Sequence, residues 1–279
     1  IMKNNCASCV GMDVNKILRT NNTKQPKWLV KKDFVSEFIN KIPIKSYSQK
    51  QTDSSITLQF SKSRYNKYIL YWGAKSSSKI KVNDAKTAYG KFNNYGVAKI
   101  NSKGEAILHF NCPQVYSTVE KGRTKRETFY RHIHFAFSNK NNTHWTKSVY
   151  SKIVICNVSM DNVLHLRNKG DIILINSLPS EYYAKSHIPN SFNLHYKTIK
   201  NMTSSELFSW FEEVLRLNYK KLTKNIKRNF MNIYELPIIV YCGNNKCNLS
   251  QLAIKELFKK GFVNVREFNG GMEEYEKRI

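Results

Sequence analysis

The strongest constraint on the fold lies near the C-terminus, where an apolar run ends in a cysteine and a short polar loop. Residues 237–241 are apolar enough to form a buried strand, Cys242 follows at once, and a segment with helical periodicity begins after Asn248. A loop that ends at a helix N-terminus presents free backbone N–H groups and the positive end of the helix dipole, which stabilise a thiolate. We therefore predict that Cys242 is a nucleophile; the alternative is a strand-end cysteine that packs as a small hydrophobe.

The composition of the loop suits the binding of an anion. Gly243 is expected to let the backbone curl, and Asn244 and Asn245 tolerate turn conformations. The predicted anion-binding residues are Gly243, Asn244, Asn245, Lys246 and Asn248. A cysteine-dependent phosphatase would need an arginine six positions after the nucleophile, where this chain has Asn248, so that activity is excluded.

A second thiol on the same loop widens the possible chemistry. If the loop curls, Cys247 can come within disulfide range of Cys242 and resolve a persulfide or sulfenate formed there. This predicts thiol redox chemistry or sulfur relay, with Cys242 and Cys247 as the catalytic pair. The alternative is that Cys247 points into the interface between the helix and the sheet.

A series of segments in the right order, from about Ile153 to the end, resembles a rhodanese-like domain. The segments are residues 171–176, Glu181-Tyr182, residues 186–194, Tyr241-Cys242 with its loop, then Ser250, Ala253, Leu257, residues 261–265 and residues 270–275. The resemblance implies a small doubly wound α/β domain without a cofactor. It also implies that Cys242 accepts a sulfane sulfur and passes it on as a persulfide, with the loop amides around the transferred group.

Two departures from the family pattern weaken the case for thiosulfate as the donor. The Asp-x-Arg that follows the first strand in the family is replaced by Asn176-Ser177-Leu178. Lys246 is the only cation of the loop, and Cys247 stands at the place of an arginine. Thiosulfate is a dianion that bidentate guanidinium contacts would recognise, so another sulfane-sulfur donor or a thiol acceptor is expected as the partner.

Composition bounds the rest of the chain. Its 279 residues suffice for two domains, and the net charge is +26. Residues 151–279 hold 19 Lys+Arg and 12 Asp+Glu, or +7, which leaves +19 for residues 1–150. Such a field attracts polyanions, nucleic acid above all. The alternative is compositional bias, because Lys, Asn, Ile and Tyr are frequent throughout, as an A/T-rich coding genome would produce. The composition of residues 1–150 and their fusion to a rhodanese-like domain resemble proteins of large DNA viruses.

The chain has the features of a soluble protein of a reducing compartment. It contains no run of about 18 apolar residues, and its first residues lack the apolar stretch of a signal peptide. Six cysteines over this length are too sparse for a disulfide scaffold. We expect a cytoplasmic protein, or a virion-associated one if the chain is viral, and no membrane partner.

The first half divides into a basic leader, residues 1–55, and a β-rich module, residues 56–152. The leader holds one amphipathic helix, residues 28–42, and a polar linker; its Cys6-x-x-Cys9 pair has the spacing of half a zinc site, although free thiols are favoured. Short apolar or alternating runs predict strands at residues 56–60, 68–72, 96–100, 106–110, 131–137 and 149–156, with a short helix near 82–89. This pattern favours a β-sandwich or a β-barrel for residues 56–152. The whole chain is then predicted to be of the α+β class, with the rhodanese-like domain, residues 153–279, as its second part.

Two motifs of the β-rich module carry further hypotheses. His132 and His134 would share one face of a strand, so they could bind a metal with His109, Cys112 or His144 as a third ligand. The favoured interpretation has no metal and leaves both histidines on solvent or beside the basic surface, opposite a core face formed by Ile133, Phe135 and Phe137. The basic run Lys121–Arg126, followed by Phe129 and Tyr130, would suit single-stranded nucleic acid; a solvated hairpin tip is the alternative.

Two functions follow from these observations. The chain is a sulfurtransferase or thiol-redox protein that uses Cys242 as a persulfide carrier, beside a basic β-rich module. Alternatively, the rhodanese-like domain is a catalytically inactive interaction domain in a basic structural or packaging protein, of viral or other origin, that binds polyanions.

Overall fold

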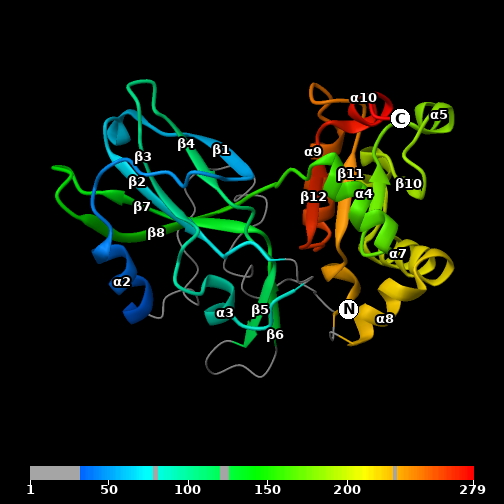
Figure 1. Cartoon of the computed structure of the whole chain (residues 1–279), viewed down its shortest axis with the longest axis horizontal. Helices are drawn as coiled ribbons and strands as arrows, with labels where there is room; N and C mark the ends of the chain where they lie inside the picture. The colour runs from blue at the N-terminus through cyan, green and yellow to red at the C-terminus, as the bar shows by residue number, and fades with distance from the viewer. Residues whose placement is uncertain (1–31, 78–80, 120–125, 229–230) are drawn as a thin grey trace. The chain divides into compact units, whose positions relative to one another are not determined.

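The computed structural model describes residues 32–77, 81–119, 126–228 and 231–279 (Figure 1). The chain divides into two compact units, and the boundary between them in the sequence falls between Val154 and Ile155. Across the described ranges, no helix combines the length and the apolar character that crossing a membrane requires.

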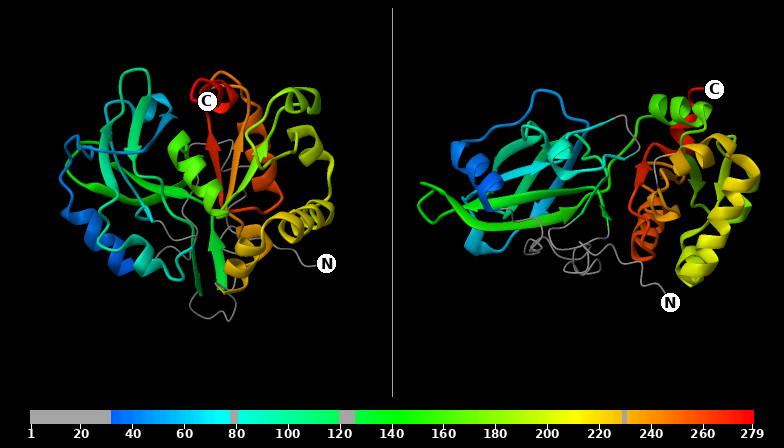
Figure 2. Two further views of the ribbon diagram at one scale, coloured as in Figure 1. Left: turned by 45° about the vertical axis from the view of Figure 1, so that its right-hand side comes forward. Right: turned by 90° about the horizontal axis from the view of Figure 1, so that it is seen from below.

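The first unit is rich in β-strands. Its elements are α2 (Lys32–Lys41), β1 (Ser54–Gln59), a 3-10 turn (Lys62–Arg64), β2 (Tyr68–Gly73), α3 (Ala85–Tyr89), β3 (Tyr95–Lys99), β4 (Glu105–Phe110), β5 (Tyr116–Val119), β6 (Arg126–Phe129), β7 (His132–Ser138) and β8 (Trp145–Ile153). An antiparallel sheet has the order β3-β2-β7-β8, and the pairs β1-β4 and β5-β6 form two further antiparallel ladders (Figure 2).

Strand β7 lies at the centre of this unit, and every one of its residues is buried. Side chains alternate across a strand. One face of β7 carries Phe135 and Phe137, whose rings pack edge-to-face against Phe60. The opposite face carries His132 and His134. A strand with two buried faces requires cover on both sides, so this unit has layers of side chains above and below its main sheet.

The second unit alternates strands and helices. Its elements are α4 (Met160–Lys169), β9 (Ile173–Asn176), α5 (Ser180–Lys185), β10 (Ser191–Asn193), α6 (Tyr196–Asn201), α7 (Ser204–Asn218), α8 (Lys220–Arg228), a 3-10 turn (Ile233–Glu235), β11 (Ile238–Tyr241), α9 (Leu249–Lys259), β12 (Val265–Phe268) and α10 (Gly271–Glu276). The longest helix, α7, begins at a capping box in which Thr203 and Glu206 satisfy each other's backbone N–H groups.

The four strands of this unit are parallel, in the order β10-β9-β11-β12, and helices lie on both faces of the sheet (Figures 1 and 2). The chain leaves β9 toward one edge and returns to the other side of β9 at β11, which makes the gap between these strands a topological switch point. On β11, Ile239 and Tyr241 join a core cluster with residues of α4 and α10. By alternation, Val240 and Cys242 face the other side, where α9 packs.

The structure confirms the mixed α+β class, with a β-rich region followed by a doubly wound domain. The predicted strands are present with ends shifted by up to four residues, and the short helix near residues 82–89 is α3. The β5-β6 ladder lies where no strand was assigned, because Tyr116–Val119 is short and carries Ser117 and Thr118. Of the predicted helix at residues 28–42, the structure describes α2; Cys6, Cys9 and residues 121–125 of the basic run lie outside the described residues.

Candidate active site

Cys242 follows β11 directly, at the carboxyl end of the parallel sheet. In open α/β sheets, ligands bind at this end and next to the switch point. The neighbouring strand β9 ends at Asn176, and Ser177 donates hydrogen bonds from its N–H and its hydroxyl to the carbonyl oxygen of Tyr241, both at 2.9 Å. The topology therefore places Cys242 where a doubly wound domain carries its chemistry.

Helix α10 holds the start of the loop. The N–H groups of Met272 and Glu273 donate to the carbonyl oxygens of Cys242, at 3.0 Å, and Gly243, at 2.9 Å. Gly271 allows this contact, because its φ is +60° and a Cβ there would lie 2.3 Å from the carbonyl oxygen of Cys242. Gly243, by contrast, is not among the positive-φ glycines, and a Cβ there would meet nothing within 4 Å. A positive φ is therefore found at Gly271, which lets α10 approach the loop, and not at Gly243.

The rest of the loop is folded on itself. Its Asn244 accepts two hydrogen bonds, from the N–H of Lys246 to Oδ1 at 3.1 Å and from the N–H of Cys247 to the carbonyl oxygen at 3.0 Å. Lys246 and Asn245 are exposed, and the carbonyl oxygen of Asn248 accepts from the first turn of α9. Two of the amides that were expected to surround an anion are therefore used within the loop in this conformation.

The sulfur of Cys242 is buried and faces oxygen atoms. Its Sγ lies 3.3 Å from the carbonyl oxygen of Cys247 and 3.9 Å from that of Asn244. The Ser250 hydroxyl lies 3.4 Å away, and that hydroxyl donates to the carboxylate of Glu267 at 2.6 Å. Two carbonyl oxygens can only accept, so the Cys242 side chain is placed here as a neutral thiol that donates its hydrogen.

The surroundings of Cys242 raise its pKa, which differs from the prediction of a stabilised thiolate. Burial of Cys242, followed by its hydrogen bond with the Cys247 thiol, raises its pKa to about 11, although the Ser250 hydroxyl and N–H act in the opposite direction. The prediction assumed that the helix N-terminus would dominate. Desolvation outweighs it, because only 1% of the residue's surface is exposed.

The structure brings the two predicted catalytic cysteines together. Cys247 is half-buried, both cysteines are free, and the two side chains are within hydrogen-bonding reach. The alternative, in which Cys247 points away into the interface between the helix and the sheet, does not describe this contact. The two thiols form an adjacent pair at the end of β11.

The sequence argument missed two buried polar side chains at this site, Ser250 and Glu267. Ser250 is fully buried at the start of α9, and Glu267 is 6% exposed on β12. Gln251 also donates to the Glu267 carboxylate, at 3.3 Å. One feature of the sequence could have indicated Glu267: it is an acidic residue in a short segment that begins with Val265 and ends with Phe268, as a buried strand would.

His132 and His134 are buried rather than exposed to solvent, which corrects the expectation for this strand. Their Nε2 atoms lie 3.1 Å apart and 3.2 and 2.8 Å from the hydroxyl of Tyr89. The outer nitrogens contact the Tyr130 carbonyl at 2.6 Å and the Ser151 hydroxyl at 2.7 Å. Hydrogen bonds thus satisfy both rings within a polar cluster of the core.

The suggested third metal ligands are not gathered around this pair. Within the ranges that the structure covers, no group of three or more His, Cys, Asp or Glu side chains could hold a metal. His144 is exposed, and Cys112 is disulfide-bonded, as is Cys156. The disulfide-bonded state of these two cysteines differs from what a reducing compartment would favour.

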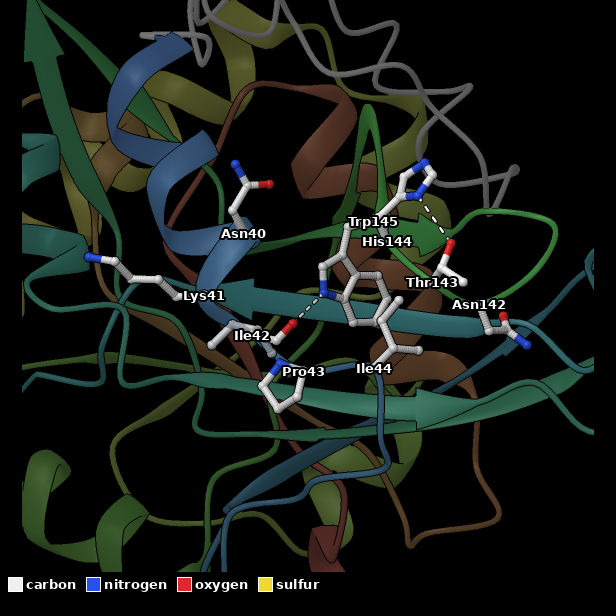
Figure 3. Close-up of a pocket in the computed structure, with 9 residues that line it drawn as sticks. All are labelled: Asn40, Lys41, Ile42, Pro43, Ile44, Asn142, Thr143, His144 and Trp145. Atoms are coloured by element: carbon white, nitrogen blue, oxygen red, sulfur yellow. Dashed lines mark hydrogen bonds between the residues drawn. The ribbon is translucent and has the colours of Figure 1, made fainter.

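A surface pocket of about 440 Å³ lies in the first unit, between the end of α2 and the turn that joins β7 to β8 (Figure 3). The indole N–H of Trp145 donates to the carbonyl oxygen of Ile42 at 2.7 Å across it, and Thr143 contacts His144 at 3.2 Å. Its polar lining includes Lys41 and His144, the latter a suggested metal ligand, but neither Cys242 nor Cys247. The pocket is therefore separate from the cysteine pair.

The parallel strand order, the cysteine after the central strand and the helix that follows it define a small doubly wound α/β domain with a thiol at the carboxyl end of its sheet. Residues 159–278 match the family model of the rhodanese-like domain, and the second unit is a rhodanese-like domain. The family match does not extend to the first unit.

Solved structures similar to this chain include sulfurtransferases. The human single-domain sulfurtransferase TSTD1 is 17% identical, with 44% of this chain and 96% of that chain covered and a TM-score of 0.32. The single-domain sulfurtransferase RDL2 of Saccharomyces cerevisiae is 13% identical, with 45% and 91% covered and a TM-score of 0.33. The BH2092 protein of Bacillus halodurans is 22% identical, with 44% and 72% covered and a TM-score of 0.31. No curated protein sequence matches.

Proposed function

We propose that the second unit is a sulfurtransferase or thiol-redox domain in which Cys242 carries a persulfide and Cys247 resolves it. The observation that carries this proposal is the contact between the two free thiols at the end of β11, at the switch point of the sheet. The family match over residues 159–278 supports the same chemistry.

The proposed reaction has two steps. The Cys242 thiolate attacks the outer sulfur of a sulfane-sulfur donor, the bond between that sulfur and the donor breaks, and the donor leaves as a thiolate while Cys242 becomes a persulfide. The Cys247 thiolate then attacks Sγ of Cys242, which releases hydrosulfide and leaves a Cys242–Cys247 disulfide. An external dithiol reduces this disulfide and restores both thiols.

The anion-binding residues of the loop have a limited part in this scheme. Lys246 is exposed and supplies the positive charge next to the cysteines, whereas the amides of Lys246 and Cys247 would have to release Asn244 before they could bind an anion. A persulfide or a neutral polysulfide donor requires less charge neutralisation than thiosulfate does. We therefore propose a persulfide-type donor.

Intact-mass spectrometry of the reduced full chain tests the proposal. After brief exposure to a panel of sulfane-sulfur donors, the wild-type chain should gain one sulfur mass and then lose it as an internal disulfide. The Cys247→Ser variant should keep the added sulfur, and Cys242→Ser should gain none. A gain that survives in Cys242→Ser, or no gain with any donor, would reject the carrier role.

A second function is supported by the closed surroundings of Cys242. Its sulfur faces two carbonyl oxygens and is buried, as expected of a cysteine that is structural and not reactive. In this alternative, the rhodanese-like domain is a catalytically inactive interaction domain and the basic first half of the chain binds polyanions such as nucleic acid. Under this alternative Cys242→Ser would leave partner binding unchanged.

A further inference from the structure

The Ser250 hydroxyl has one hydrogen to donate and lies between the carboxylate of Glu267 and the sulfur of Cys242. It lies 2.6 Å from Oε1 of Glu267 and 3.4 Å from Sγ of Cys242. A hydroxyl donates one hydrogen and accepts through its lone pairs. The shorter contact, to a carboxylate, takes the hydrogen, which leaves a lone pair directed at the sulfur.

A hydrogen bond from that hydroxyl would stabilise a deprotonated Cys242. Of the partners around Sγ, the carbonyl oxygens of Asn244 and Cys247 cannot donate at all. Beside the Ser250 N–H and the Cys247 thiol, the Ser250 hydroxyl is a donor that could turn to a thiolate, and hydrogen bonds to charged groups are the strong ones. Glu267 and the Cys242 thiolate are therefore competitors for one hydrogen bond.

We propose that Glu267 is a positioning residue that acts through Ser250 to hold Cys242 as a neutral, slowly reacting thiol. The inference rests on the proposed function, because it explains how that same nucleophile is kept protonated between turnovers. A neutral thiol is oxidised and alkylated far more slowly than a thiolate, so the cysteine would be protected until a donor or partner rearranges the loop.

Other charged and titratable groups near Cys242 belong to the loop and to α10. Lys246 is exposed on the loop, and Cys247 contributes its thiol. On α10, Glu273 pairs with Lys277 at 2.6 Å and also interacts with Asn244 and Lys246. Glu267 differs from these groups because it lies on β12 and reaches Cys242 through the Ser250 hydroxyl, which contacts both side chains.

The test is the rate at which iodoacetamide labels Cys242 in the full chain, resolved by peptide mass and followed against pH. Glu267→Gln removes the carboxylate charge at nearly constant volume and leaves a neutral amide oxygen, a weaker acceptor that holds the Ser250 hydrogen less strongly. The labelling rate at pH 7.5 should rise about tenfold, since one unit of pKa corresponds to a tenfold change in the thiolate fraction. The midpoint of the pH profile should fall by about one pH unit.

A double-mutant cycle separates the path through Ser250 from a direct effect of charge. In a Ser250→Ala background, Glu267→Gln should change the labelling rate less than twofold, because the shared hydroxyl is gone. An equal increase in both backgrounds would overturn the route through Ser250, and no increase in either would overturn the role of Glu267. Ser250→Thr keeps the hydroxyl and should retain the full effect of Glu267→Gln.

Controls protect this experiment against a general loosening of the domain. Glu235 is also a buried glutamate of the second unit, at 3% exposure, and its carboxylate accepts from the N–H of Asn232. Glu235→Gln should leave the labelling of Cys242 unchanged, and an increase equal to that of Glu267→Gln would also overturn the inference. Alkylation needs no sulfur donor, so this result is independent of whether Cys242 carries a persulfide.

Discussion

At the scale of single residues, the site is governed by desolvation and by the acceptors around Cys242. A helix N-terminus can lower a cysteine pKa, but burial of Cys242 raises it to about 11. Proximity to helix α9 was therefore a poor guide to reactivity, because the thiol lies beneath the loop and not at its surface. The sequence could predict the position of the cysteine on the chain but not its depth in the domain.

The first prediction concerns the order in which the two cysteines react. At pH 7, iodoacetamide should label Cys247 before Cys242, because Cys247 is half-buried and Cys242 is buried with a raised pKa. Peptide mass spectrometry over a time course measures both rates in one sample. Labelling in urea provides the control, where the two rates should converge; faster labelling of Cys242 in the folded chain would contradict the geometry.

The second prediction concerns His132 and His134, whose burial lowers their pKa values, that of His132 to about 4 and that of His134 well below its usual range. A group whose pKa is lower in the folded state stabilises the fold above its unfolded pKa of about 6.5 and loses this contribution as the pH falls. Lowering the pH from 7 to 5 should reduce the free energy of unfolding by about 2 kcal/mol through His132 alone.

Urea unfolding of the full chain at the two pH values measures this loss. His132→Gln should reduce the dependence on pH, because the side chain no longer titrates. His144→Gln is the matched control, since His144 is an exposed histidine of the same unit, and its unfolding should depend on pH as that of the wild type does. An equal dependence in all three proteins would show that the buried pair does not titrate on unfolding.

At the scale of elements, the fold was predictable where one physical signal dominated. The apolar run predicted β11, and the resemblance of the ordered segments to a rhodanese-like domain implied the doubly wound sheet. Strand β7 was also predicted, but one of its faces was assigned wrongly, because His132 and His134 look polar in the sequence. Their burial depends on Tyr89, a residue of α3 that no local pattern connects to them.

The site was predictable only in part for the same reason. Cys242 and Cys247 lie on one loop, so their proximity followed from local spacing. Ser250 and Glu267 come together through a contact between α9 and β12, which depends on the packing of the finished domain. Likewise, the close approach of α10 to the start of the loop requires Gly271 on a separate element, whereas a Cβ at Gly243 within the loop would meet open space.

The third prediction tests how α10 supports the cysteine loop. Gly271→Ala should destabilise the second unit by roughly 2 kcal/mol or more, because the residue has a φ of +60° and its Cβ would clash with the Cys242 backbone. Gly243→Ala is the matched control and should change the stability by less than about 0.5 kcal/mol, since its Cβ would meet open space. Urea unfolding measures both, and equal costs would contradict the support by α10.

At the scale of the whole molecule, charge and thiol chemistry are divided between the two halves of the chain. The first 150 residues carry +19 of the net charge of +26, whereas the cysteine pair lies in the second unit. Compositional bias and a polyanion-binding surface make different predictions for this division. If composition alone explains the charge, exposed lysines of both units should contribute equally to polyanion affinity. If the first unit has a binding surface, its lysines should contribute more.

The last prediction compares two sets of exposed lysines. A variant with Lys50, Lys99 and Lys103 changed to glutamate should bind single-stranded DNA more weakly than the wild type. The magnitude of the slope of log affinity against log salt should fall by about one for each phosphate that the variant no longer neutralises.

The matched control changes Lys185, Lys197 and Lys200, which are exposed in the second unit, and should keep the wild-type slope. Fluorescence anisotropy at several salt concentrations measures both. If the two variants lose affinity equally, the lysine excess reflects composition, and the basic first half has no dedicated polyanion-binding surface among the residues tested.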